Sequence, residues 1–265
     1  MTVLSSFVNT LVQVWLCAAF LMFWLWIIQN FYRNAVVADI GFCVMFGVLS
    51  IVYAVGLPGD PVRKGLLGMM GAVYGFRLAS HLTLDRLYKK AEDARYQTLR
   101  EAMGAWAQSG FFLYFQGQAV ALAVFSIPLL ILMVNPFPPF SLWEVIGIFC
   151  WVFAIAGEAS ADYQLRRFRM NPSHVGKTCR VGWWYYCRHP NYFFEGCIWS
   201  SYVVMAIGIP WGWLTVIGPL GMMIALLKVS GIPYAEARAI VTRGDDYRDY
   251  QRTTNALIPW FPKSS

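Results

Sequence analysis

The sequence predicts an all-α, polytopic membrane protein with seven transmembrane helices, its N-terminus outside and its C-terminus in the cytosol. Three observations support this prediction. The chain is 58% hydrophobic and only 13% charged, whereas about a quarter of the residues of a soluble domain are charged. Apolar runs of about 17 to 25 residues, long enough to cross a hydrocarbon core of roughly 30 Å, recur along the chain. Lys and Arg are concentrated in alternate loops.

Each apolar run is expected to form one spanning helix. The first run lacks a basic n-region and a small-residue cleavage site, and it is longer than a signal-peptide core, so it is predicted to be a retained span. The last two runs flank "IPWG" and are predicted to form a tight pair. The predicted spans are 7–31, 36–57, 65–84, 110–134, 142–161, 192–209 and 211–229.

The basic residues predict the orientation. Five Lys or Arg lie in 85–109, six in 162–191 and six from residue 228 onward, whereas 135–141 and the turn at 210 have none. Arg33 lies in the first loop, and Arg63 and Lys64 lie in the second. The positive-inside rule therefore places the odd-numbered loops and the tail in the cytosol. The net charge of +7 is mainly a topology signal, with lipid headgroups as its ordinary partner, and we expect no nucleic-acid binding.

Ionisable residues inside the predicted spans are the most informative, because an unpaired charge there costs at least about 2.5 to 3.5 kcal/mol. They are Asp39, Arg77, His81, Glu158 and Glu195. Arg77 and His81 share a helical face with Tyr74, which predicts a polar cavity beside that face. The alternative is a structural ion pair between Asp39 and Arg77 that ties two helices together.

Polar residues also gather where three segments are predicted to leave the membrane, about 85–109, 162–191 and 228–265. Asp162, Arg166 and Arg169 follow one another at spacings of four and three, so they share one helical face. Such mixtures of charge suit charge-assisted binding of a polar ligand, although solvated helix ends are the alternative. The tail is predicted to extend the last helix as far as Gly244, and "LIPWF" to return aromatic side chains to the membrane interface.

Some classes of site are not expected. The chain has no GxGxxG or GxxxxGK loop, so any nucleotide is held by neither a Rossmann unit nor a P-loop. The six cysteines show no CxxC pairing, and we predict neither a disulfide nor a metal site from them.

Several strings together resemble one known family. They are "AEDARYQTLR", "FFLYFQGQ", "ADYQLRRFR", "GWWYYCRHPNYFFEG", "SGIPYAEAR" and "DDYRDYQRTTNALIPWFP". In this order they are similar to the steroid 5-alpha-reductase family, in particular its bacterial membrane branch, from about residue 36 to the end. "RHPNY" alone recurs in other membrane enzymes, so the ordered set carries the resemblance.

The resemblance implies a single integral membrane reductase domain over 1–265, in the bacterial inner membrane. Such an enzyme uses NADPH to saturate the 4,5 double bond of a 3-oxo-4-ene steroid or a similar apolar enone taken from the bilayer. It needs no obligatory protein partner. By the matching motifs, the cofactor is expected to be held by Asp162, Arg166, Arg169, Asn191 and Glu195, with Tyr186, His189, Tyr192, Glu92, Arg95, Tyr96, Glu236 and Arg238 nearby.

The resemblance also implies the catalytic pair. Asp39 and Tyr74 take the places of the family's carboxylate and tyrosine, which donate to the substrate ketone. A donor is needed there because the ketone oxygen gains charge as hydride reaches the β-carbon. The sequence departs from the family in two ways: Asp39 stands where the animal enzymes have Glu, and Phe194 replaces a small Gly before Glu195.

Two rival functions stay open. Isoprenylcysteine carboxyl methyltransferases share an "RHP-Y" element and a similar tail, and would bind S-adenosylmethionine. The "ADYQLRRFR" string, Asn191 and the abundance of Arg favour a phosphate-bearing cofactor instead. A non-enzymatic lipid- or sterol-binding protein would use the same polar residues as helix ties and headgroup contacts.

Overall fold

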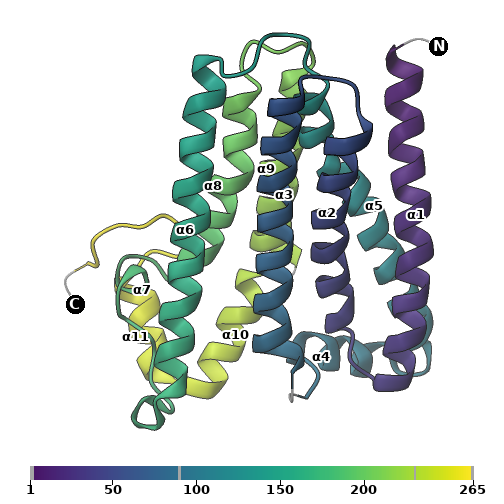
Figure 1. The fold of residues 1–265 in the computed structure, drawn as a ribbon. Coiled ribbons are helices and arrows are strands. Elements are labelled where there is room, and N and C mark those ends of the chain that lie inside the picture. The colour runs from purple at the N-terminus through teal and green to yellow at the C-terminus, as the bar shows by residue number, and fades with distance from the viewer. Residues whose placement is uncertain (1–2, 89–90, 230, 264–265) are drawn as a thin grey trace. The chain divides into compact units, whose positions relative to one another are not determined.

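The structure, a computed structural model, describes residues 3–88, 91–229 and 231–263 (Figure 1). Every regular element of these residues is helical, which confirms the predicted all-α class. The chain divides into two compact units: unit 1 is Met1–Ser141 with Gly208–Ile217, and unit 2 is Leu142–Ile207 with Gly218–Ser265. Lys89 and Lys90, counted above in the third loop, lie outside the described residues, as does Ser230 of "SGIPYAEAR".

Unit 1 is built around long helices joined by short turns. Its α-helices are α1 (Val3–Tyr32), α2 (Val36–Gly56), α3 (Pro61–Leu82), α4 (Ala94–Met103) and α5 (Ala107–Met133). The π-helical turn η1 (Thr83–Leu87) extends α3, and the 3-10 turns are η2 (Gly104–Trp106) and η4 (Gly212–Val216).

Unit 2 combines two long packed helices with several short ones. Its elements are α6 (Leu142–Met170), η3 (Pro172–His174), α7 (Trp183–Tyr186), α8 (Pro190–Met205), α9 (Ile217–Ile224), η5 (Ala225–Val229), α10 (Ile232–Arg243) and α11 (Asp245–Thr253). Gly244 has a φ of +57°, a conformation that glycine adopts without strain. Gly244 therefore ends the helix at Arg243 as predicted, although α10 is a separate helix that begins at Ile232.

The apolar helices indicate a membrane protein, although fewer of them qualify as spans than predicted. All seven predicted runs are largely helical. Among the described residues, five helical stretches are long and apolar enough to cross a membrane: Ser5–Tyr32, Val36–Gly56, Ala94–Met133, Leu142–Met170 and Gly212–Arg243. The α8 helix has only 16 residues, short of the roughly 20 that a span needs. The α3 helix is long enough to span a membrane, but its mean hydropathy is too low. Its several glycines and the polar residues Tyr74, Arg77 and His81 lower this mean.

Helices α2 and α3 approach each other closely because α3 presents glycine. A Cβ atom at Gly75 would lie 2.5 Å from the Cys43 carbonyl oxygen, and one at Gly71 would lie 2.1 Å from Ser50 Oγ. Small residues allow such backbone approach in membrane helix pairs. The contact places Tyr74 of α3 beside Phe46 of α2, where the two rings meet edge to face at 5.6 Å.

Helices α6 and α8 pack by a similar device. A Cβ atom at Gly157 would lie 2.3 Å from the ring of Phe194, so the glycine makes room for this side chain. Phe194 is fully buried and also meets Trp183 and Phe153 edge to face. Phe194, which departs from the pattern of the steroid 5-alpha-reductase family, therefore fits inside unit 2 because Gly157 of α6 has no side chain.

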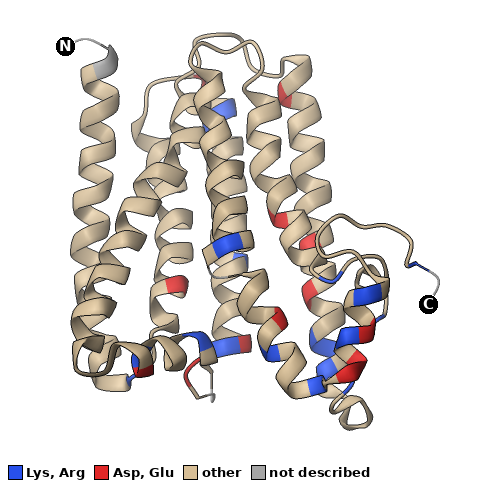
Figure 2. Cartoon of the chain, turned by 180° about the vertical axis from the view of Figure 1, so that it is seen from behind, with Lys and Arg blue, Asp and Glu red and all other residues tan. Residues whose placement is uncertain are grey.

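Charged residues gather toward one end of the long helices in each unit (Figure 2). Two cations of the second loop, Arg63 and Lys64, lie at the opposite end and bond to backbone carbonyls of the protein. Arg63 is 4% exposed and donates to the carbonyl oxygens of Asn135, Phe137 and Pro138 at 2.9, 2.8 and 2.8 Å. Lys64 Nζ donates to the Leu57 carbonyl at 2.6 Å. These two cations therefore have a structural role.

Candidate functional site

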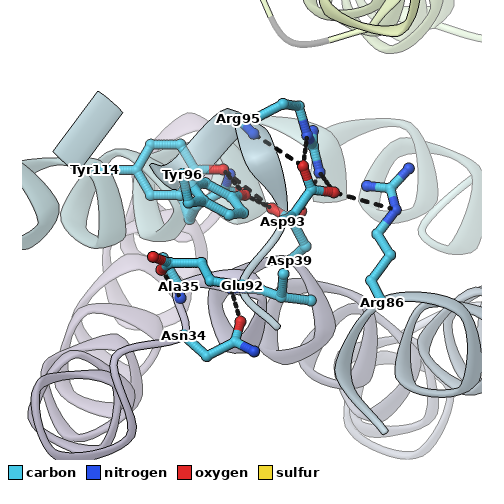
Figure 3. A network of polar contacts seen from close by, with 11 residues as sticks. Asn34, Ala35, Asp39, Arg86, Glu92, Asp93, Arg95, Tyr96 and Tyr114 are labelled. Atoms are coloured by element: carbon cyan, nitrogen blue, oxygen red, sulfur yellow. Dashed lines mark hydrogen bonds and ion pairs between the residues drawn. The ribbon is translucent and has the colours of Figure 1, made fainter. Parts of the chain in front are cut away.

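The centre of the polar cluster in unit 1 is the carboxylate of Asp39, in the first turn of α2 (Figure 3). Tyr96 OH and Tyr114 OH both donate to Asp39 Oδ1, at 2.7 and 3.0 Å, and lie 2.9 Å from each other. Arg95 Nη2 lies 3.3 Å from Asp39 Oδ2. Gln118 Nε2 donates to Tyr114 OH at 2.9 Å. Asp39 thus accepts hydrogen bonds from three side chains of α4 and α5.

The start of α4 sets the direction of Arg95 and Tyr96. Asp93 caps this helix by accepting from the Arg95 backbone N–H at 3.0 Å, and it also accepts from the Arg95 guanidinium at 3.2 Å. Arg86 Nε lies 3.7 Å from Asp93. Burial works to raise the pKa of Asp93, but the adjacent Arg95 holds it below its usual value of 3.8. Arg95 therefore bridges two carboxylates, Asp93 and Asp39.

Glu92 lies just before α4 and joins this helix to the first loop. Its Oε1 accepts from the Ala35 backbone N–H and from Arg100 Nη2, both at 2.8 Å. Arg100 also lies 3.3 Å from Gln29 Oε1 of α1. The sequence predicted Glu92 to lie near the cofactor; within the protein it contacts the Ala35 backbone and Arg100. Glu92 therefore fastens α4 to the ends of α1 and α2.

Tyr74 lies deeper in unit 1 than Asp39. It is 1% exposed and is positioned by Phe46, two helical turns along α2 from Asp39. Within the described residues, the hydroxyl partners of Asp39 are Tyr96 and Tyr114, and its ion pair is with Arg95. These contacts of Asp39 are thus with α4 and α5, and an ion pair between Asp39 and Arg77 stays a prediction.

The "RHPNY" motif of unit 2 is held by a second polar cluster around Glu236 of α10. Glu236 Oε1 accepts from Arg188 Nε at 2.8 Å and lies 3.0 Å from His189 Nε2. Gln251 Nε2 donates to Glu236 Oε2 at 2.8 Å. The His189 ring stacks on Tyr192 with centroids 5.3 Å apart. Two predicted site residues, Glu236 and His189, are thus brought into direct contact.

The backbone of the same motif is bonded to the tail. The N–H groups of Arg188 and His189 donate to the carbonyls of Asn255 and Ala256 at 2.9 and 3.0 Å. Trp260 N–H donates to the Tyr186 carbonyl at 2.9 Å. We call residues 253–263, which make these bonds, the C-terminal clasp. It holds residues 186–189 at the entrance to α8.

The acidic and basic residues of α6 lie on one face of the helix, and their exposure increases toward its C-terminal end. Glu158 and Asp162 are buried at 3% and 8% exposure, whereas Arg166 and Arg169 are exposed. In the described part of the chain, the side chain of Arg166 has no hydrogen-bonding or ion-pair partner. The arrangement leaves the Arg166 guanidinium available at the end of α6.

Helix α8 presents two more predicted residues. Asn191 follows Pro190 in the first turn, where the helix N-terminus is positively polarised. Its partly buried amide has no hydrogen-bonding partner within the described residues, and the exposed Arg238 of α10 likewise has none. Glu195, one turn further along α8, is buried and accepts from Trp199 Nε1 at 2.9 Å.

Tyr186 is the last of the predicted cofactor-binding residues. Its ring meets Tyr185 and Phe261 edge to face at 5.1 and 5.6 Å, and its carbonyl accepts a bond from the C-terminal clasp. Among the described residues, no group of three or more His, Cys, Asp or Glu could hold a metal ion.

Comparison with known proteins gives a family. The family model described as "Protein of unknown function (DUF1295)" matches residues 25–254. The chain belongs to this family. No curated protein and no solved structure matches the chain.

The DUF1295 match contains every site residue named above and ends at Thr254, within the C-terminal clasp. The description of DUF1295 assigns no activity. The chemistry must therefore be argued from the residues themselves.

Several residues of these clusters were not predicted as site residues, among them Asp93, Tyr114, Arg188 and Gln251. Tyr114 and Gln118 are polar residues four apart inside an apolar run, a signal that could have found Tyr114. Asp93 directly precedes the polar string that forms α4, and Asp is among the residues favoured at an N-cap. The partner of Arg188 lies 48 residues away, and sequence spacing does not reveal it.

Proposed function

We propose that this DUF1295 protein is an NADPH-dependent membrane reductase that saturates the carbon–carbon double bond of an apolar, steroid-like enone. The observation that carries the proposal is the Asp39 carboxylate with two tyrosine hydroxyls and Arg95 around it. This cluster contains Asp39, one of the two residues that the family resemblance expects to polarise the ketone. The proposed setting is the bacterial inner membrane, with the charged helix ends in the cytosol.

The residues of unit 2 fit an anionic cofactor. Arg166, Asn191 and Arg238 offer donors that have no partner in the described part of the protein. Arg binds phosphate groups through paired donors, which favours NADPH over a ligand without phosphates. Asp162, Arg169, Glu195, His189, Tyr192 and Tyr186 are proposed to complete the binding set. NADPH, when bound, supplies the hydride that is added to the β-carbon of the enone.

In unit 1, the hydroxyl hydrogens of Tyr96 and Tyr114 are donated to Asp39, and each hydroxyl has only one. These tyrosines are therefore proposed to orient Asp39, rather than to contact the ketone. Tyr74 is proposed to donate to the ketone oxygen as this oxygen gains negative charge. The products are the saturated ketone and NADP⁺, and the proton that reaches the α-carbon comes from water.

The decisive experiment uses the full chain in lipid nanodiscs. Binding of NADPH and of S-adenosylmethionine is measured first, and NADPH oxidation is then followed with a panel of 3-oxo-4-ene steroids. The proposal expects NADPH binding and steroid-dependent oxidation. Binding of S-adenosylmethionine without NADPH would favour the methyltransferase, and binding of neither would favour a lipid- or sterol-binding protein.

Tyr74→Phe tests the assignment of the donor. Loss of one oxyanion donor typically lowers turnover about 100-fold or more, and we expect NADPH affinity to be retained. Tyr32→Phe is the matched control, because Tyr32 is 79% exposed. Unchanged turnover in Tyr74→Phe would remove this residue from the mechanism.

A further inference from the structure

The C-terminal clasp has two different sides. Its inner side is bonded to the "RHPNY" motif through the backbone of Asn255, Ala256 and Trp260. The Cys187 thiol also donates to the Leu257 carbonyl at 2.7 Å, and Lys263 N–H donates to the Thr253 carbonyl at 2.8 Å. The segment is therefore folded against unit 2 over most of its length.

The outer side of the clasp is apolar and uncovered. Ile258, Trp260 and Phe261 are 66, 67 and 71% exposed. The bonds at Trp260 N–H and at the neighbouring Leu257 carbonyl hold the backbone here, and the three exposed side chains lie within four consecutive residues. The exposed Lys263 follows directly. Aromatic side chains beside a cation are typical of protein surfaces at the headgroup level of a bilayer.

The position of the C-terminal clasp along α6 agrees with the headgroup level of a bilayer. Trp183 Nε1 donates to Ser160 Oγ at 2.8 Å, and Trp184 Nε1 donates to the Ala161 carbonyl at 2.9 Å. Tyr186 lies two residues after Trp184, and its carbonyl accepts the bond from Trp260 of the C-terminal clasp. Ser160 lies 18 residues after the start of α6 at Leu142, which corresponds to about 27 Å at roughly 1.5 Å per residue. A hydrocarbon core is about 30 Å thick.

We propose that Ile258, Trp260 and Phe261 insert into the headgroup region of the bilayer, and that this insertion holds the C-terminal clasp on the "RHPNY" motif. The partner is a lipid surface with anionic headgroups, for which Lys263 supplies the complementary charge. Because the same segment bonds Arg188 and His189, the membrane would stabilise the entrance of α8 through it. In Figure 1 this segment passes near the middle of α6 and then projects away from it toward the C-terminus.

Depth-dependent quenching tests the insertion. The full chain is placed in nanodiscs of phosphatidylcholine and phosphatidylglycerol that carry a nitroxide either at the headgroup or midway along the acyl chain. The chain has 12 Trp residues, so the signal of Trp260 is the difference between the wild type and Trp260→Phe. We expect this signal to be quenched most by the headgroup label. Quenching by aqueous iodide alone, or by none of the probes, would overturn the proposal; the latter would indicate a protein cover.

Hydrogen exchange tests the coupling to the motif. In the same nanodiscs, the double variant Trp260→Ser/Phe261→Ser is expected to speed amide exchange of residues 186–189 about tenfold or more, since local opening sets the exchange rate. Trp260→Tyr/Phe261→Tyr keeps side chains that favour the interface and should exchange as the wild type does. Val175→Ser, at an 82% exposed position outside the clasp, controls for surface polarity.

Wild-type exchange in the serine variant would overturn the coupling, as would equal acceleration in the tyrosine variant. The tyrosine variant also keeps the test open if the serine variant does not fold. None of these measurements uses a cofactor or a steroid, so their outcome is independent of the proposed reductase function.

Discussion

The Tyr96 hydroxyl donates a 2.7 Å hydrogen bond to Asp39 Oδ1, which ties α4 to the first turn of α2. Tyr96 is 4% exposed, and its ring also meets Phe111 and Tyr114 edge to face. The bond joins residues 57 positions apart, so it organises unit 1 as well as the candidate site.

Tyr96→Phe is therefore expected to destabilise the protein. The variant loses a hydrogen bond to a carboxylate, which typically contributes about 1.5 to 3 kcal/mol, and Asp39 keeps only Arg95 and Tyr114. Thermal unfolding in detergent should show a lower midpoint for Tyr96→Phe than for Tyr32→Phe, whose hydroxyl is exposed. Equal midpoints for the two variants would show that the Asp39 cluster does not stabilise unit 1.

The packing of Phe194 against Gly157 gives a second prediction. A Cβ atom at position 157 would lie 2.3 Å from the Phe194 ring, so Gly157→Ala should cost about 1 to 3 kcal/mol through overpacking. Adding Phe194→Leu should recover much of this loss, because the two sites are in direct contact and their effects are coupled. Unfolding midpoints of the two single variants and the double variant measure the coupling.

Gly117→Ala is the matched control for this prediction. Gly117 also lies inside a long helix, but a Cβ atom there would meet nothing within 4 Å. Alanine favours a helix over glycine by about 0.5 to 1 kcal/mol, so this variant should be neutral or slightly stabilised. If both alanine variants behave alike, close packing at Gly157 is not the reason for its presence.

These two contacts show what sequence can and cannot predict. Apolar runs located the long helices, because burial in lipid demands a continuous apolar stretch, but they did not predict how many of these helices are long and apolar enough to span a membrane. The sequence also identified Phe194 as a departure and Asp39 as a residue that needs a partner. It did not identify Gly157, Tyr114 or Arg95 as those partners, since a partner depends on the register between helices distant in the chain.

The polar contacts around the start of α4 were predicted less well than the long helices. Glu92 and Tyr96 are four residues apart, a spacing at which two residues of one helix share a face. The helix instead begins after Asp93, which caps it, so Glu92 lies outside the helix and pairs with Arg100. A shift of two residues in a helix start is enough to exchange one set of partners for another.

Arg63 provides a third prediction, which separates a structural role from a topology signal. Arg63→Met would leave the carbonyls of Asn135, Phe137 and Pro138 without their buried donor. A loss of about 3 kcal/mol is expected from bonds to a charged group, seen as a lower unfolding midpoint. Arg63→Lys keeps the charge but not the planar fork of donors, so it should be intermediate. Wild-type stability in Arg63→Lys would mean that charge alone matters at this position.

The fourth prediction concerns the thiol beneath the C-terminal clasp. Burial raises the pKa of Cys187 to about 11 from its ordinary value of 9.0, and its donated bond to Leu257 favours the protonated form. Alkylation requires the thiolate. At pH 8, Cys187 in the folded protein should therefore react about 100-fold more slowly than in the denatured chain, and its rate should keep rising until about pH 11. Mass spectrometry of alkylated peptides gives both rates.

The same shift has a consequence for stability, and its sign follows from proton linkage. The folded state keeps a proton on Cys187 that the unfolded state releases above pH 9.0. The stabilisation is fully present below pH 9 and is lost as the pH rises toward about 11. Cys187→Ala lacks this group, so its unfolding midpoint should fall less between pH 8 and pH 10 than that of the wild type. Identical pH dependence in the two proteins would show that the thiol is accessible to water and that the C-terminal clasp does not cover it.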